Sequence, residues 1–514
     1  MVSYSTLGSP SGSSEPIRGR GRRTSHAFKG QNRGGEASWI SSNINLVNTI
    51  VGAGTLAMPL AMAHMGILLG SVVILWSGLT AAFGLYLQTR CARYLERGSA
   101  SFFALSQITY PNAAVIFDAA IAIKCFGVGV SYLIIIGDLM PGVVRGFNES
   151  ADAIPFLVDR QFWVTVFMLV VIPLAFLRRL DSLKYTSVVA LISIGYLVIL
   201  VVYHFLEGDT MPDRGVIRII TWGGLVPTLQ SFPVIVFAYT CHQNMFSILN
   251  EIKVNSPQRL AIVPPHLATA HPPASSTTSV IAASIGSAAS IYVLVAITGY
   301  LSFGNSVAGN IVGMYIPSIA STIGKGAIVI LVTFSYPLQV HPCRASVDAV
   351  MKWRPGGRSA RISPNGSPVR LVPLLTGNSA PTGSRNDSIG ELRFAIITTV
   401  IVILSYVVAM TVSSLDRVLA YVGSTGSTSI SFILPGLFYY KISAPESIHH
   451  QRLLKDEDED DDGPDSEAGS RGYLSKSWRT AIVRKLSLAL AVYGLFVMIL
   501  CLGTNMFFTG GPAH

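Results

Sequence analysis

The chain has 514 residues, of which 50% are hydrophobic and only 12% are charged. An average soluble domain carries about 25% charged residues, so this composition excludes an ordinary soluble domain and favours a protein built for lipid. The net charge of +10 would suit a nucleic-acid binder, but in so apolar a chain the loops that hold the basic residues matter more. We therefore predict the lipid bilayer as a partner, and no nucleic acid.

Residues 1–38 are rich in Ser, Gly and Arg and contain no apolar core before a small-residue cleavage site. We therefore expect no removable signal peptide, and a disordered basic cytosolic tail instead. The remaining organisation is predicted as core helices 1–8 at 39–353, a disordered cytosolic loop at 354–390, helices 9 and 10 at 391–441, an acidic cytosolic loop at 442–479, and helix 11 with a lumenal C-terminus at 480–514.

The fold class that this pattern predicts is an all-α polytopic membrane protein with about eleven transmembrane helices, because a bilayer core of about 30 Å needs about 20 apolar residues per helix. The predicted spans are 41–63, 67–89, 113–139, 162–177, 185–205, 225–249, 279–302, 323–341, 394–412, 417–440 and 481–506. With a cytosolic N-terminus, 30 Lys and Arg residues fall on the cytosolic side and 6 on the opposite side. This asymmetry follows the positive-inside rule.

The first span is unusual because two glycines, several polar side chains and a proline crowd the stretch from Asn45 to Pro59. Interrupted backbone at membrane depth is tolerated where it is buried in protein or lines a watery cavity. In transporters with broken helices, the N-terminal ends of half-helices bind the substrate carboxylate. The run Gly52-Ala53-Gly54 fits such a break, although a small-residue packing face of the GxxxG kind explains it equally well.

The sixth span repeats this pattern, because polar groups from Tyr239 to Asn244 lie near its middle. Two breaks five spans apart are what an inverted five-plus-five repeat predicts, with the first helix of each half discontinuous. His242 lies in this stretch as a candidate proton carrier. The alternative role, a hydrogen-bonded structural histidine, is the commoner one.

Three stretches of the chain resemble a known family: Asn45–Pro59, Ser101–Pro141 and Phe237–Ser247. They are similar to the amino acid/auxin permease family of the amino-acid/polyamine/organocation superfamily, especially its fungal vacuolar amino-acid transporters, and also to the sodium-coupled neutral amino-acid transporters. The resemblance covers nearly all predicted spans. The tail and the loops at 354–390 and 442–475 fall outside it.

The resemblance implies a LeuT-like core of ten helices plus an eleventh, with broken helices 1 and 6. It also implies secondary active transport of amino acids across a vacuolar or lysosomal membrane by alternating access, without a cofactor. The substrate-binding positions that it implies are Asn48, Thr49, Gly52, Ala53, Gly54 and Thr55 in the first helix, and Phe237, Ala238, Tyr239 and Thr240 in the sixth.

The coupling ion is left open between H⁺ and Na⁺. In the sodium-coupled relatives an eighth-helix hydroxyl and the first-helix backbone hold Na⁺, and Ser335 falls at that position here. Vacuolar relatives are understood to use protons, so we expect proton linkage. The two rival interpretations are a sodium-coupled importer of the plasma membrane and an amino-acid sensor that signals through its cytosolic tail.

Lys124 is a further ion-coupling candidate, beside Ser335 and His242. It lies about 11 residues into the third span, roughly 16 Å along a helix and close to the midplane. A lysine there costs about 2.5 to 3.5 kcal/mol or more, and such residues usually mark a pathway. Asp118, six residues away, points about 120° around the axis and is a poor partner. Lys124 is either part of proton coupling or a fixed structural charge.

The sequence indicates no disulfide, metal-binding or enzymatic chemistry. The five cysteines include no CxxC pair, so neither a disulfide framework nor a zinc site is expected. No phosphate loop, HExxH or GxSxG motif is present, so we predict no enzyme. The acidic run at 455–467 and the nearby His449 and His450 are interpreted as a solvated linker rather than a partner or metal site. Asn148 begins a sequon in a predicted lumenal loop, where glycosylation is a candidate modification.

Overall fold

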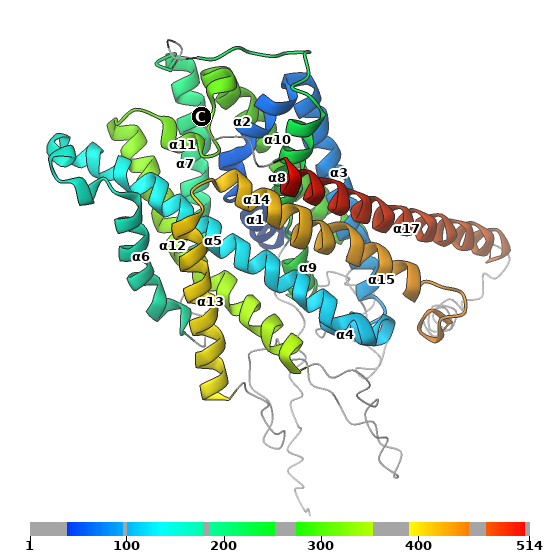
Figure 1. Ribbon diagram of the computed structural model, residues 1–514. Helices are drawn as coiled ribbons and strands as arrows, with labels where there is room; N and C mark the ends of the chain where they lie inside the picture. Colours follow the sequence, from blue (N-terminus) through cyan, green and yellow to red (C-terminus); the bar gives the residue numbers. More distant parts are fainter. Residues whose placement is uncertain are drawn as a thin grey trace, which may run out of the picture. The chain divides into compact units, whose positions relative to one another are not determined.

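The computed structural model, drawn in Figure 1, describes residues 39–95, 100–177, 186–210, 212, 214–251, 274–352, 390–451 and 469–508. All regular structure in these ranges is helical, which confirms the predicted all-α class. These residues belong to one unit, Gly35–His514. The predicted tail at 1–38, nearly all of the loop at 354–390 and the acidic run at 455–467 lie outside the described ranges.

Every predicted span coincides with a helix or with a pair of shorter helices. The single helices are α3 (Ile67–Ala92), α5 (Ala114–Phe147), α6 (Arg160–Ala175), α7 (Thr186–Glu207), α10 (Ala274–Phe303), α12 (Ile319–Lys352), α13 (Glu391–Thr411) and α17 (Gly469–Phe507). The pairs are α1 (Trp39–Ile50) with α2 (Gly54–Met65), α8 (Leu225–Ala238) with α9 (His242–Glu251), and α14 (Leu415–Val422) with α15 (Leu434–Ile442).

Seven helices of the described chain are long and apolar enough to cross a membrane, and the bent pair α1–α2 raises the number to eight. The figure of eleven crossings stays a prediction. Several helices extend past the predicted spans, since α5 continues to Phe147, α12 continues to Lys352 and α17 begins at Gly469. Hydropathy marks the lipid-embedded part of a helix, whereas its backbone hydrogen bonds can continue beyond the bilayer.

The loops add short helices that the sequence did not reveal. They are α4 (Phe102–Thr109), α11 (Ile311–Met314) and the 3₁₀ turns η1 (Pro111–Ala113), η2 (Glu149–Ala153), η3 (Pro155–Leu157) and η6 (Gly304–Ser306). Ser101 caps α4, because its hydroxyl accepts a hydrogen bond from the Ala104 N–H at 3.1 Å. Asn250 of α9 holds the start of this segment, with its amide bonded to both the N–H and the C=O of Ala100.

The tenth predicted span differs from expectation, because two π-helical turns replace its middle: η7 (Gly423–Ser427) and η8 (Ser429–Ile433). Hydroxyls in this stretch bond to preceding carbonyls, with Ser424 donating to Ala420 at 2.7 Å and Thr428 to Gly423 at 2.6 Å. Such back-bonding competes with the regular α-helical ladder and favours a local distortion. Single π-helical turns often occur at functional sites.

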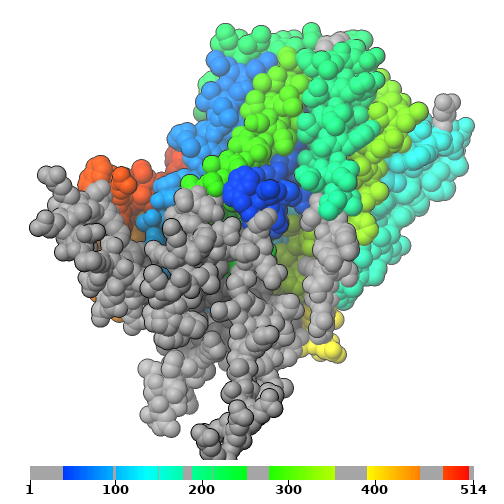
Figure 2. Space-filling view, turned by 180° about the vertical axis from the view of Figure 1, so that it is seen from behind, coloured from blue at the N-terminus to red at the C-terminus, as the bar shows by residue number. Residues whose placement is uncertain are grey.

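The packing places the broken helices in the interior. The half-helix α2 contacts both α8 and α10, and α5 packs along α12. Figure 2 shows α10 running between α3 and α7 on one face, and both neighbours contact it. At the opposite end of the sequence, α17 packs along α15 (Figure 1). The breaks of α1–α2 and α8–α9 are therefore surrounded by protein.

Candidate functional site

The first break lies between α1 and α2, which meet at an angle of 56°. The N–H groups of Thr55 and Leu56 bond to the carbonyls of Gly52 and Ala53, at 3.0 and 3.2 Å. Among the described residues, no acceptor is bonded to the N–H groups of Gly52, Ala53 or Gly54. A Cβ built on Gly52 would have no heavy atom within 4 Å, so open space adjoins the break. An unwound turn with unbonded donors beside open space suits an anionic group.

The second break separates α8 from α9. The chain leaves α8 by a tight turn, in which the Thr240 N–H bonds to Phe237 at 3.0 Å and the Thr240 hydroxyl to Val236 at 2.8 Å. The same hydroxyl lies 3.2 Å from Ser431 of the π-helical stretch. The predicted interruptions of both helices are thus present in the structure, and the end of α8 points its carbonyl groups into the interior.

The two breaks are in direct contact. A Cβ on Gly54 would lie 2.6 Å from the Ala238 Cβ, so the first residue of α2 touches the last residue of α8. The Tyr292 hydroxyl of α10 bridges both ends, because it lies 2.7 Å from the Ile50 carbonyl and 2.8 Å from the Ala238 carbonyl. The alternative interpretation, in which the small residues let helices pack closely, is thus partly right, because Gly54 permits the close contact of α2 with α8.

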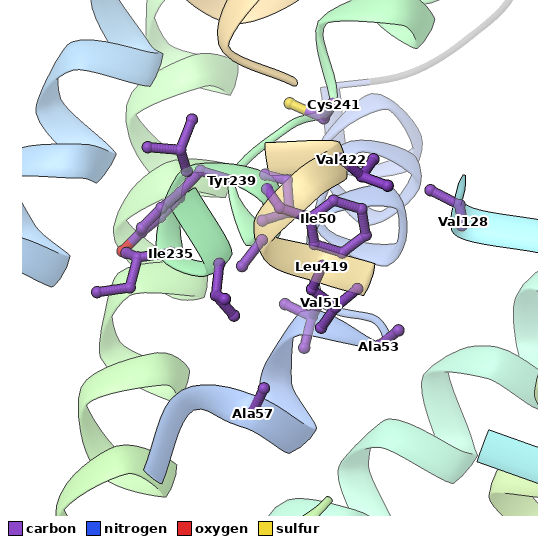
Figure 3. Close-up of a cluster of buried hydrophobic side chains, with 14 of the residues drawn as sticks. Ile50, Val51, Ala53, Ala57, Val128, Ile235, Tyr239, Cys241, Leu419 and Val422 are labelled. Atoms are coloured by element: carbon purple, nitrogen blue, oxygen red, sulfur yellow. The ribbon is translucent and has the colours of Figure 1, made fainter. Parts of the chain in front are cut away.

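Apolar side chains surround the meeting point. Figure 3 shows Ile50 and Val51 of the first break beside Tyr239 and Cys241 of the second, with residues of α5 and α14 around them. The buried members drawn there also include Ala53, Ala57, Val128, Ile235, Leu419 and Val422. A ligand in this place would be largely shielded from water, which strengthens any charge interaction that it makes.

The structure places the remaining predicted binding residues as follows. Asn48 is half-buried, and its Oδ1 is buried without a hydrogen-bond partner in the described part of the chain. Thr49 accepts a hydrogen bond from Asn244 of α9 at 3.2 Å, so it joins the two broken helices. Thr55 and Phe237 are buried. All ten predicted positions therefore lie at or next to the two breaks.

Tyr239 presents a buried hydroxyl that has no hydrogen-bond partner among the described residues. Its ring packs edge to face on the Tyr292 ring, with centroids 5.0 Å apart. Tyr292 was not among the binding residues predicted from the sequence. Its signal was a tyrosine within a predicted span, where Tyr300 is a second one.

Lys124 is 4% exposed on α5, and in the described chain it has no hydrogen-bond or ion-pair partner. Its Cβ would lie 2.7 Å from a Cβ on Gly426, so it packs against the π-helical turn η7. The run of Gly, Ser and Thr from Gly423 to Ser429 was a sequence signal for this turn that hydropathy alone overlooked.

The other two ion-coupling candidates, His242 and Ser335, have different surroundings from Lys124. His242 is fully buried, and its Nε2 lies 3.1 Å from the Ala81 carbonyl of α3, the geometry of a structural histidine. Ser335 is half-buried on α12, and within the described ranges it has no hydrogen bond to either break. Its role as a Na⁺ ligand stays a prediction.

The five thiols are buried and not joined by disulfides. In the described ranges, no three side chains of His, Cys, Asp or Glu gather in a way that could hold a metal ion. His450 contacts the Tyr94 hydroxyl at 3.0 Å. The Asn148 side chain accepts a hydrogen bond from the Ser150 N–H at 2.9 Å, and its glycosylation stays a prediction.

Two interrupted helices whose breaks meet in a buried centre are the arrangement of a LeuT-like fold. The structure is similar to the crystal structure of MhsT in complex with L-phenylalanine, with a TM-score of 0.53 and 12% identity over 92% of this chain and 100% of that chain. The family model "Transmembrane amino acid transporter protein" matches residues 35–457, and the chain belongs to this family. The family is one of transporters, as the sequence predicted, and not of enzymes.

The relatives agree with this assignment. Vacuolar amino acid transporter 5 of Schizosaccharomyces pombe is 40% identical, over 92% of this chain and 95% of that protein. Vacuolar amino acid transporter 6 of Saccharomyces cerevisiae is 37% identical, over 91% and 98%. Sodium-coupled neutral amino acid symporter 2 of Danio rerio is more distant, at 22% identity over 80% and 77%.

Proposed function

We propose that this protein is a secondary active transporter that carries amino acids across a vacuolar-type membrane by alternating access. The observation that carries the proposal is the contact between the two breaks, where Gly54 meets Ala238 beside the open space at Gly52. The similarity to vacuolar amino acid transporters of two yeasts supports both the cargo and the membrane.

The geometry supports a specific way of holding the substrate. The unbonded N–H groups of Gly52, Ala53 and Gly54 would receive the α-carboxylate, because donors at a helix N-terminus favour an anion. The carbonyl ends of α8 and the unpartnered Oδ1 of Asn48 would receive the α-ammonium group. Every amino acid carries these two groups, so this part of the site sets the class of substrate and not its side chain.

A proton is the coupling ion that we propose, with Lys124 as the candidate carrier. The support is its burial on α5 against the π-helical turn η7, without a hydrogen-bond or ion-pair partner in the described chain. Flux driven by a pH gradient should fall strongly in Lys124→Ala, and unchanged flux would remove Lys124 from the coupling mechanism. Opposed Na⁺ and pH gradients in proteoliposomes test the sodium alternative at Ser335, which the distant sodium-coupled relative keeps open.

The function itself is tested by reconstituting the purified chain in proteoliposomes. Competition by each of the twenty amino acids, at two internal pH values, should reveal saturable flux that collapses when the gradient is dissipated. Binding without net flux would instead indicate a sensor, in which case deletion of residues 1–38 should abolish capture of a cytosolic partner. A fluorescent fusion expressed in yeast should mark the vacuolar membrane rather than the cell surface.

A further inference from the structure

One face of α17 carries an open groove with a volume of about 580 Å³. The side chains that line this groove are Lys485, Leu488, Ala489, Val492, Tyr493 and Phe496. They follow one another at helical spacings of three and four residues, so they share one face of the helix. All of them except the half-buried Tyr493 are exposed. The groove therefore lies on the outside of the described chain.

The opposite face of α17 packs against the protein. Ser487, Ala491 and Gly494 are buried there. A Cβ on Gly436 of α15 would stand 2.9 Å from the Ala491 Cβ, and a Cβ on Gly494 would stand 2.8 Å from the Phe432 Cβ of η8. These close approaches fix the rotation of α17 about its axis. The grooved face is consequently turned outward, where a membrane protein meets lipid.

Tyr493 forms a fixed wall of the groove. Its hydroxyl accepts a hydrogen bond from the Trp76 Nε1–H of α3 at 3.1 Å, and the two rings meet edge to face with centroids 6.5 Å apart. The ring also lies against Phe432, with centroids 5.6 Å apart. A side chain held by two neighbouring elements does not turn to fill the space beside it. The groove is thus a formed feature of the helix surface.

Positive charge lies at one end of the groove only. Lys485 is the lining residue nearest the start of the predicted span 481–506, and the other lining residues are apolar except for the Tyr493 hydroxyl. Arg484 lies beside it, donating to the Tyr440 carbonyl at 3.2 Å. Within the described ranges, neither cation forms an ion pair with a carboxylate. A lysine near the end of a membrane helix extends to the level of the lipid headgroups.

The groove has the length of one leaflet. From Lys485 to Phe496 the helix advances about 11 residues, or roughly 16 Å. This is about half of a hydrocarbon core that is about 30 Å thick. With the cytosolic N-terminus predicted from the sequence, Lys485 lies at the cytosolic surface, and the cytosolic leaflet is the one that holds anionic lipids. Length, charge and apolar lining all match a single lipid with an anionic headgroup.

We propose that this groove binds an anionic glycerophospholipid of the cytosolic leaflet. The headgroup would lie at Lys485, and an acyl chain would run along Val492 to Phe496. The bound lipid would support the packing of α17 on α15 and on the π-helical turn η8. This inference depends on neither the cargo nor the coupling ion, because lipid binding is measured on the purified chain without flux.

The test titrates the purified full chain in detergent with phosphatidylserine, phosphatidylinositol or phosphatidylcholine and counts bound lipids by native mass spectrometry. The native chain should retain either anionic lipid in preference to phosphatidylcholine. Lys485→Gln should lower the affinity for phosphatidylserine about fivefold, the usual contribution of one basic residue at a membrane surface. Val492→Trp fills the middle of the groove and should lower the retention of phosphatidylserine without loss of folding, because Val492 is 59% exposed.

Two matched controls lie on the same helix. Arg479→Gln removes the same charge, but Arg479 precedes Lys485 by six residues and points about 240° around the axis. Its replacement should change the affinity for phosphatidylserine little. Ile499→Trp adds the same bulk two turns beyond Val492, on the same face but past the end of the groove, and should leave lipid retention unchanged.

Several outcomes would overturn the site. Equal losses in Lys485→Gln and Arg479→Gln would show a general attraction of basic residues to anionic lipid. Equal retention of phosphatidylcholine and phosphatidylserine by the native chain would remove the role of charge. A preference that survives both groove substitutions would place the lipid elsewhere. A dimer that becomes a monomer in Val492→Trp, by light scattering, would make a second copy of the chain the occupant. Absence of amino-acid flux with the lipid preference intact would refute the proposed function and leave this site standing.

Discussion

Gly54 and Ala238 lie in contact at the centre of the molecule, so close that a Cβ on Gly54 would stand 2.6 Å from the Ala238 Cβ and 2.9 Å from its Cα. One residue begins α2 and the other ends α8. The two broken helices can therefore hold this relative position only while residue 54 has no side chain. The proposed binding site depends on that contact.

Gly54→Ala should damage both stability and transport. Neither neighbouring atom belongs to a flexible side-chain end, so the half-helices must separate, at a cost of about 1–3 kcal/mol for overpacking. Thermal unfolding of the purified chain and flux in proteoliposomes measure the two effects. Gly286→Ala on α10 is the matched control, because a Cβ there has open space around it and its stability should be unchanged or slightly higher.

A compensating variant sharpens this prediction. Ala238→Gly removes the atom at 2.6 Å and should restore part of the stability lost in Gly54→Ala. Strictly additive effects of the two substitutions would contradict the contact.

Tyr292→Phe should loosen the junction without changing the packing of its ring. The variant removes the hydroxyl that is shared by the Ile50 and Ala238 carbonyls but keeps the edge-to-face contact with Tyr239. Loss of a buried hydrogen bond that leaves acceptors unsatisfied costs about 1–3 kcal/mol. Tyr421→Phe removes a single, part-buried hydrogen bond to the Asn505 carbonyl from a residue that is 38% exposed, and it should cost less in the same unfolding measurement.

His242 variants should separate stability from pH dependence. His242 is fully buried and bonded to the Ala81 carbonyl, and a Cβ on Gly84 would lie 2.8 Å from its Nε2. His242→Gln can keep a donor to that carbonyl but fits the cavity less well, so the midpoint of thermal unfolding should fall while the pH profile of flux keeps its shape. A displaced pH profile in a stable variant would reinstate His242 as a proton carrier.

Asp348 anchors the end of α12 to α13. Its side chain is 3% exposed and lies 2.6 Å from Arg393 and 2.7 Å from Lys352, both of which are partly exposed. Asp348→Asn should destabilise the chain by about 1–3 kcal/mol, because it removes a buried charge that two cations share. Asp152→Asn breaks an exposed pair with Arg145 and should cost no more than about 1 kcal/mol. Equal effects of the two substitutions would contradict this difference.

The predicted helices were found because lipid imposes a strong and simple rule on a sequence. A segment in the bilayer must be apolar and must satisfy its own backbone hydrogen bonds, so α3, α10 and α13 follow from composition and length alone. The breaks could also be predicted from the sequence. The small and polar residues at Gly52 to Gly54 and at Tyr239 to Asn244 are unusual for a helix that faces lipid. The π-helical turns escaped detection because a hydroxyl bonded to its own helix leaves the span apolar on average.

By itself, the sequence determined the class of protein, the positions of its helices, the two interruptions and the presence of a lysine within a span. It could not determine what these features face, because contacts between distant helices depend on packing that no local pattern encodes. Only the tertiary structure decided that Gly54 touches Ala238, that Tyr292 joins both helix ends, that His242 is held by a carbonyl and that Lys124 is buried against Gly426. In a densely packed interior, the neighbours of each side chain assign its role, and those neighbours come from elsewhere in the chain.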